Sequence, residues 1–170
     1  MPTRSDPPGD EVMLSFPPRT SYVAPATDFV TCFCSEHTLD KATLSRVQLA
    51  AHELSENVVK YAADQACTVR VRTDRDPAKG GPVSLSITTE NAVLPDALRR
   101  VEAYLSALEA ATDPDEFYDE QIAETAKRAN GSGLGLARIR SEAAMDIRHH
   151  SHGGRLCITA CLLLPRAGES

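Results

Sequence analysis

The sequence predicts an α+β fold, a two-layer sandwich in which a mixed, mostly antiparallel sheet is covered on one face by helices. Residues 68–72 and 83–89 alternate apolar and polar side chains, and glycines and prolines separate them, as in two antiparallel strands. Residues 145–148 and 155–164 form a second pair of strand-like runs around the Gly153-Gly154 turn. The segments between these pairs have apolar residues at helical spacing.

The remaining elements follow in chain order. Residues 11–16 alternate and end at two prolines, which predicts a short edge strand. Helical spacing then predicts a helix over residues 22–37, a long helix that ends near residue 63, and a third helix over residues 96–111. Thr112 or Asp113 is expected to cap a further helix whose acidic start is typical of a helix N-terminus rather than a metal site.

Length and composition favour a single domain. A chain of 170 residues with 42% hydrophobic residues can bury well over half of its unfolded surface in one core. We expect this domain to span residues 11–165. Residues 1–10 are expected to form a disordered tail, and residues 166–170 a short C-terminal one.

The charge pattern argues against two classes of partner. With 18 basic and 24 acidic side chains the net charge is -6, which gives no long-range attraction to nucleic acid or to anionic lipid. The N-terminus has no apolar signal-peptide run, and no window approaches the roughly 18 apolar residues of a membrane helix. The sequence therefore predicts a cytoplasmic protein without nucleic-acid or membrane partners.

The cysteines and clustered histidines do not form a recognisable metal motif. The five cysteines include no C-x-x-C pair, so neither a disulfide framework nor a zinc site is indicated, and we expect small buried hydrophobic residues. His149, His150 and His152 have no acid or cysteine at ligand spacing in the sequence. A strand end or loop is therefore the favoured interpretation of these histidines.

The long helix carries two stripes at the same period. Its apolar residues recur at steps of three and four and face a core, while Glu53, Asn57 and Lys60 form a neighbouring polar line. Taken alone, this line is also compatible with a solvated face in which an acid and a base pair weakly, by ~0.2 to 0.5 kcal/mol.

A second signal lies about seventy residues further on. Gly131, Gly133 and Gly135 alternate, and a helix is predicted to start at about Leu134, so free backbone N–H groups would point at a bound phosphate. A glycine run by itself is equally typical of a flexible turn. The spacing does not match a dinucleotide fingerprint, and the lysine of a P-loop is absent from it.

Together the two signals resemble the GHKL, or Bergerat-fold, ATPases, which include sensor histidine kinases and anti-sigma-factor serine kinases. The segment HELSENVVKYA resembles the N box of that family, and GSGLGLARI resembles its second glycine box, with further likeness over residues 11–164. The resemblance implies ATP and Mg²⁺ as cofactors, Glu53 as general base, Asn57 as magnesium ligand and Lys60 beside the phosphates. It also implies an ATP lid around the phosphates, made by Gly131, Ser132, Gly133, Leu134, Gly135 and Leu136.

The resemblance has one departure, at the adenine end. The first glycine box of the family, an aspartate followed by two spaced glycines, should follow the strand at residues 83–89, where this chain reads ENAVLPD. Glu90 would then replace the aspartate that binds the adenine amino group, and Thr159 is a second candidate on the adenine side.

The resemblance implies a regulatory protein that binds Mg-ATP and a protein partner, of the sigma-factor or anti-sigma-antagonist type, and phosphorylates it as a serine/threonine kinase. The alternative is a non-catalytic protein-binding module of the same fold that has lost adenine recognition. A third reading is the ATPase domain of a two-component kinase, but no phosphoacceptor helix pair precedes Glu11. The sequence leaves open whether the chain forms a homodimer.

Overall fold

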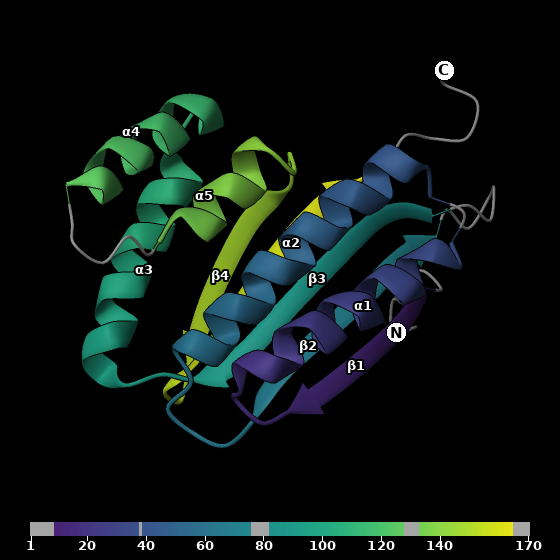
Figure 1. Cartoon of the computed structure of the whole chain (residues 1–170), viewed down its shortest axis with the longest axis horizontal. Helices are drawn as coiled ribbons and strands as arrows, with labels where there is room; N and C mark the ends of the chain where they lie inside the picture. Colours follow the sequence, from purple (N-terminus) through teal and green to yellow (C-terminus); the bar gives the residue numbers. More distant parts are fainter. Residues whose placement is uncertain (1–8, 38, 76–81, 128–132, 165–170) are drawn as a thin grey trace, which may run out of the picture.

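Five strands form one antiparallel sheet in the computed structural model, which describes residues 9–37, 39–75, 82–127 and 133–164 (Figure 1). The sheet has the order β1-β2-β3-β5-β4, and each of its four pairings is antiparallel. The strands are β1 (Gly9–Phe16), β2 (Cys67–Arg75), β3 (Pro82–Ala92), β4 (Asp146–His152) and β5 (Arg155–Leu163). The predicted α+β sandwich is confirmed, and the sheet is purely antiparallel instead of mixed.

The helices lie together on one face of this sheet, so that the other face is open (Figure 1). They are α1 (Val23–Ser35), preceded by the 3-10 turn η1 (Thr20–Tyr22), α2 (Lys41–Lys60), α3 (Pro95–Ala110), α4 (Pro114–Ala126) and α5 (Leu134–Ser141). Helices α1 and α2 pack side by side, and α4 packs against α5 at the outside of the molecule. We call the uncovered side of the sheet the open face.

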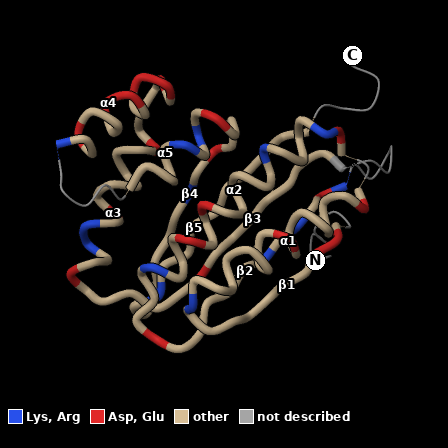
Figure 2. The backbone as a smooth tube through the Cα atoms, in the orientation of Figure 1, with Lys and Arg blue, Asp and Glu red and all other residues tan. Residues whose placement is uncertain are grey.

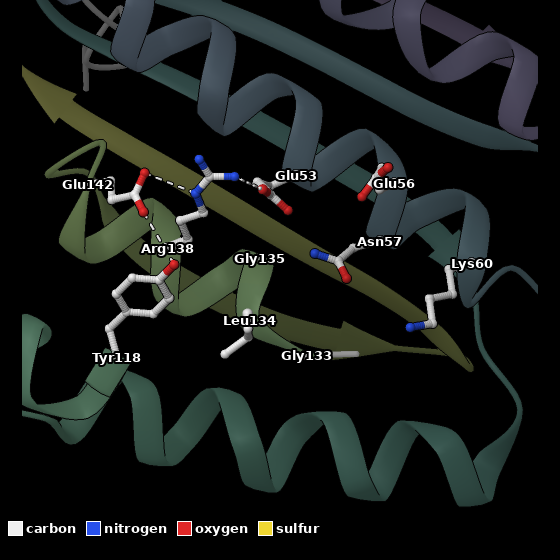
Figure 3. A pocket seen from close by; sticks show the side chains of 10 residues that line it. All are labelled: Glu53, Glu56, Asn57, Lys60, Tyr118, Gly133, Leu134, Gly135, Arg138 and Glu142. Atoms are coloured by element: carbon white, nitrogen blue, oxygen red, sulfur yellow. Dashed lines mark hydrogen bonds and ion pairs between the residues drawn. The ribbon is translucent and has the colours of Figure 1, made fainter. Parts of the chain in front are cut away.

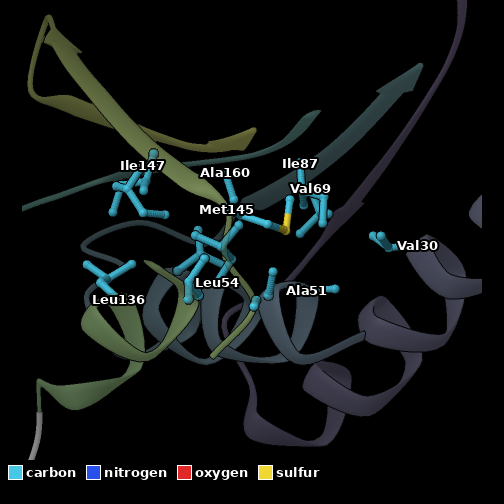
Figure 4. Packing of buried hydrophobic residues seen from close by; sticks show 14 of the residues in the cluster. Val30, Ala51, Leu54, Val69, Ile87, Leu136, Met145, Ile147 and Ala160 are labelled. Atoms are coloured by element: carbon cyan, nitrogen blue, oxygen red, sulfur yellow. The ribbon is translucent and has the colours of Figure 1, made fainter. Parts of the chain in front are cut away.

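Helix α2 is the central element of the helical layer. Its N-cap is Asp40, whose side chain accepts a hydrogen bond of 2.9 Å from the Thr43 N–H. The predicted apolar stripe is buried: Val47, Ala51 and Leu54 are fully inaccessible to solvent. Figure 4 shows Ala51 and Leu54 facing strand residues across the core. Burial of this stripe fixes the rotation of α2 and leaves the polar line on its exposed side.

Alternation along β3 and β5 decides which side chains reach the helices. Leu85 and Ile87 on β3, like Ile158 and Ala160 on β5, belong to the core beneath the helices. Because successive side chains of a strand point to opposite faces, the residues between them point to the open face. The hydroxyls of Thr88 and Thr159 confirm this, since they lie 3.0 Å apart across the two strands on that face.

Helix α4 carries the acidic cluster that the sequence assigned to a helix N-terminus. Asp113 is its N-cap and accepts hydrogen bonds from the backbone N–H groups of Asp115 and Glu116. Figure 2 shows acidic positions along this outer helix. The capping prediction is confirmed, and Asp113 rather than Thr112 is the cap.

Several expectations concern the ends of the chain and its cysteines. Residues 1–8 and 165–170 lie outside the described residues, and β1 begins at Gly9, two residues before the predicted strand. The five cysteines are free thiols; Cys34, Cys67 and Cys157 are buried as expected, whereas Cys32 is exposed. None of the helices that the structure describes combines the length and apolarity needed to cross a bilayer.

Candidate functional site

A pocket of about 390 Å³ opens between α2 and the start of α5 (Figure 3). It unites six of the residues singled out in the sequence, although the chain separates the two helices widely: Glu53, Asn57, Lys60, Gly133, Leu134 and Gly135. Four further residues line it, namely Glu56, Tyr118, Arg138 and Glu142. The polar line of α2 therefore faces a cavity and is not an ordinary solvated face.

The α2 side of the pocket is built by helical spacing. Glu53, Asn57 and Lys60 stand at i, i+4 and i+7, which places them along one side of the helix. The Glu53 side chain is only 12% exposed. Lys60 lies at the outer end, where its ammonium group sits 5.4 Å from the centre of the Tyr61 ring. An acid, an amide and an amine thus follow one another along one wall.

The α5 side of the pocket is a helix N-terminus. Gly133 is the N-cap and has a φ of 129°, a conformation that side chains other than glycine rarely adopt. The Tyr104 hydroxyl donates a hydrogen bond of 2.9 Å to the Gly133 carbonyl, and burial raises the pKa of Tyr104 to about 12. The first-turn N–H groups of α5 have no partner within the helix and favour an anion.

Gly135 brings the two walls into contact. A Cβ atom at this position would collide with Oε2 of Glu53 and lie 3.5 Å from Nδ2 of Asn57. Only glycine therefore lets α5 approach this closely without displacing the Glu53 carboxylate. This contact explains the third glycine of the run in physical terms.

Arg138 is a site residue that the sequence reasoning missed. Its guanidinium lies 3.1 Å from Oε1 of Glu53 and 2.9 Å from Oε2 of Glu142. The hydrogen bond to Glu142 is the largest factor that raises the pKa of Arg138, and Tyr118 donates to the same carboxylate at 3.2 Å. The available signal was the spacing, because Arg138 follows Gly135 by three positions and so shares its side of α5.

The pocket contains more acid than base. Glu53, Glu56 and Glu142 oppose Lys60 and Arg138, so a polyphosphate would meet a net negative wall unless a cation accompanied it. Oxygen donors such as the Asn57 amide and the carboxylates are the ligands that Mg²⁺ prefers. The residues present therefore fit a magnesium-bound phosphate better than a free one.

Two smaller hollows share lining residues with the pocket, one beside α3 and one that reaches the sheet. The first, of about 170 Å³, lies between Asn57, Tyr61 and Tyr104. The second, of about 10 Å³, is lined by Asn57 and Leu136 together with Asn91 of β3, which is 4% exposed. Leu136 thus lines the two smaller hollows and not the main pocket. Asn91 was not a sequence candidate, yet it faces this interior from the end of β3, as does Thr89 two residues earlier.

Glu90 and Thr159, the residues expected at the adenine end, lie on the open face of the sheet instead. The Glu90 carboxylate bonds to Arg155 and lies 3.4 Å from the Cys157 thiol, and Arg155 holds the pKa of Glu90 below its ordinary value. Thr159 pairs with Thr88 on that face. The sheet separates both residues from Glu53, so the geometry does not support a shared ligand. Gly131 and Ser132 lie outside the described residues.

The chain resembles known proteins in sequence family and in fold. A family model described as the histidine kinase-like ATPase domain matches residues 16–161. No curated protein matches the chain. Among solved structures, a chain of the SiaB-SiaC complex from Pseudomonas aeruginosa has a similar fold, with a TM-score of 0.61 and 16% identity, over 90% of this chain and 89% of that chain. Because the family model matches most of its length, the chain belongs to the histidine kinase-like ATPase domain family.

Proposed function

We propose that this chain binds Mg-ATP in the pocket between α2 and α5 and phosphorylates a protein partner on a serine or threonine hydroxyl. The observation that carries the proposal is the meeting of Glu53, Asn57 and the N-terminus of α5 around one cavity. Phosphoryl transfer depends mostly on positioning and charge neutralisation. These groups would position the reactants, and the Mg²⁺ held by Asn57 together with the N-terminus of α5 would neutralise the phosphate charge. The family to which the chain belongs is consistent with this reading.

Each wall of the pocket has a role in this proposal. The Asn57 amide oxygen would hold Mg²⁺, and Lys60 with the free N–H groups of α5 would hold the phosphates. When bound, Mg-ATP supplies the γ-phosphoryl group. Glu53 would accept the proton of the attacking hydroxyl through Oε2, because Arg138 already occupies Oε1. Arg138 thereby orients the carboxylate.

The partner is inferred by analogy. The similar structure from Pseudomonas aeruginosa is a complex of SiaB with SiaC. That complex, together with the sequence resemblance to anti-sigma-factor kinases, supports a protein substrate of the sigma-factor or anti-sigma-antagonist type. A hydroxyl-bearing segment of such a partner would have to reach the Glu53 end of the pocket, beside Arg138.

Calorimetric titration of Mg-ATP into the wild-type chain and two pocket variants tests the proposal. We expect Asn57→Ala to weaken binding at least about tenfold, a loss of ~1.4 kcal/mol. Glu53→Gln, which has the same shape, should retain affinity but slow transfer by roughly 10² to 10⁴. Gln48→Ala removes an exposed amide from the same helix and serves as the matched control. Absence of heat at millimolar ligand, or unchanged affinity in Asn57→Ala, would contradict nucleotide binding.

A second candidate function is stoichiometric partner binding without catalysis. The tight hollow of about 10 Å³ beside Asn91 favours it, together with the missing first glycine box. In that case the partner would be captured without nucleotide, and Glu53→Gln would leave capture unchanged. Pull-down of the partner with and without Mg-ATP separates the two functions.

A further inference from the structure

The open face of the sheet carries a cluster of metal-ligating side chains where β4 meets β5. His150 of β4 pairs in register with Cys157 of β5, and His152, two residues further along β4, points to the same face. Ligand atoms of the three side chains all lie within 4.8 Å of one another. The sequence showed no cysteine at ligand spacing beside these histidines, because the partner comes from the neighbouring strand.

We propose that His150, His152 and Cys157 form a binding site for a divalent transition metal of the Zn²⁺ type. Two imidazoles and one thiolate are ligands that favour zinc over the oxygen-seeking ions Mg²⁺ and Ca²⁺. Three protein ligands leave one position of a tetrahedral ion for water or for an outside ligand. On binding, the thiol proton is released to solvent as the Cys157 sulfur bonds to the metal.

The geometry of the cluster is close to that of a loaded site. Zinc bonds of about 2.0 to 2.3 Å place tetrahedral ligand atoms roughly 3.3 to 3.6 Å apart, so the three atoms need to close by about 1 Å. The rings of His150 and His152 are stacked, with centroids 6.0 Å apart, and both residues are exposed. They are thus able to rotate toward Cys157, which is only 3% exposed and fixed in place.

The surroundings of the cluster provide an outer shell. Oε2 of Glu90 lies 3.4 Å from the Cys157 sulfur, and Arg155 bonds to Glu90 and, at 3.1 Å, to Asp64. With Cys157 bound as a thiolate, the negative charges of Cys157, Glu90 and Asp64 exceed the positive charge of Arg155 by two, which matches the charge of the ion. Because an ionised carboxylate is only an acceptor, Glu90 cannot hydrogen-bond to the metal-bound thiolate, and it would act on the ion through its negative charge. Glu90, which does not reach the nucleotide pocket, therefore acquires a role here.

Zinc titration of the full chain, in competition with a chromophoric chelator, tests the proposal. One equivalent should bind, and His150→Ala or Cys157→Ser should weaken binding by more than the roughly 10- to 100-fold that loss of an outer-shell partner costs. Glu90→Gln should fall within that smaller range. Co²⁺ as an optical probe should show a thiolate charge-transfer band that disappears in Cys157→Ser.

Two matched controls make the test specific. Cys161→Ser changes another cysteine of β5 on the open face, and His52→Ala changes an exposed imidazole of α2. Both should bind zinc like the wild type and, with Co²⁺, retain the thiolate band. Equal loss in the controls, or no one-equivalent binding, would overturn the proposal. If Cys157→Ser does not fold, the exposed positions His150 and His152 still decide the outcome.

Discussion

Gly135 lies so close to Oε2 of Glu53 that there is no room for a Cβ atom on Gly135. A side chain at Gly135 would meet Oε2 of Glu53, which is the flexible end of its side chain. The backbone of α5 is therefore able to accept a larger residue only if the carboxylate moves. Alanine at this position would suit the helix but displace a pocket residue. One substitution therefore separates the stability of the fold from the affinity of the site.

Gly135→Ala should preserve the fold and damage the site. Alanine in a helix ordinarily raises stability by about 0.5–1 kcal/mol over glycine. The displaced Glu53 carboxylate would lose its 3.1 Å contact with Arg138 and crowd Asn57. We expect a free energy of unfolding within about 1 kcal/mol of wild type, and Mg-ATP affinity reduced at least about tenfold. Urea denaturation and calorimetry measure the two effects.

Gly154→Ala should do the reverse: it should lower the stability of the fold and leave the Mg-ATP affinity unchanged. Gly154 lies in the β4–β5 turn with a φ of 77° and nothing within 4 Å of an added Cβ. The left-handed backbone makes alanine cost roughly 1–2 kcal/mol there, while the pocket on the other side of the sheet is untouched. A loss of nucleotide affinity in Gly154→Ala, or a large loss of stability in Gly135→Ala, would contradict this division.

The pocket residues that the sequence predicted were all recognisable from local sequence patterns. Glu53, Asn57 and Lys60 depend only on helical period, and Gly133 and Gly135 on a glycine pattern. Arg138 meets Glu53 across 85 positions of sequence, so its role depended on how two helices pack. No local pattern contains that contact.

Glu90 does not face the pocket because of its place in the alternation of β3, and that alternation was already visible in the sequence. Val83, Leu85 and Ile87 are the apolar members of the alternation, so odd-numbered residues of β3 face the helices. Continuing the alternation puts Asn91 inside and Glu90 on the open face. A shift of one residue changes a motif alignment only slightly, but in a strand it moves each side chain to the other face of the sheet.

At the scale of elements, capping residues set where two of the helices begin. Asp40 begins α2 and Asp113 begins α4, and each accepts hydrogen bonds from the first turn. The predicted helices and strands all occur, with ends that move by a few residues because end residues fray or extend a strand ladder. The strand order was not predictable from local patterns, since it depends on which edges meet after the chain crosses over the sheet.

The cap of α2 predicts a pH dependence of stability. The Thr43 hydroxyl and backbone N–H donate to Asp40 and lower the pKa of its carboxyl. The folded chain therefore holds this proton less tightly than the unfolded chain. The cap stabilises the fold above the ordinary pKa of 3.8, and this stabilisation is lost as the pH falls through the lower folded pKa.

Asp40→Asn isolates this effect, because asparagine retains an acceptor oxygen but does not titrate. The difference in urea midpoint between wild type and Asp40→Asn should shrink as the pH falls from about 5 to about 3. Thr43→Val removes the hydroxyl donor and should reduce the pH-dependent part of the difference. A difference that stays constant with pH would show that the Asp40 carboxyl is not linked to folding.

At the scale of the whole molecule, one helix serves both the core and the pocket. Leu54 of α2 is fully buried among strand and helix residues, while its neighbour Glu53, about 100° further round the helix, faces the pocket (Figures 3 and 4). The sheet in turn separates the pocket from the proposed metal cluster on the open face. The molecule thus has a shared scaffold with two independent surfaces, and damage to the scaffold should lower stability without changing the intrinsic affinity of either.

Leu54→Ala tests this independence. Loss of the buried side chain should lower the free energy of unfolding by about 2–5 kcal/mol, whereas Leu163→Ala, at a residue 82% exposed, should change it by less than about 0.5 kcal/mol. Because Glu53 and Asn57 keep their positions, Mg-ATP at 100 times its Kd should restore about 2.7 kcal/mol to Leu54→Ala. Thermal unfolding with and without Mg-ATP measures both quantities. No recovery in a folded Leu54→Ala that shows wild-type zinc binding would mean that core and pocket are coupled through α2.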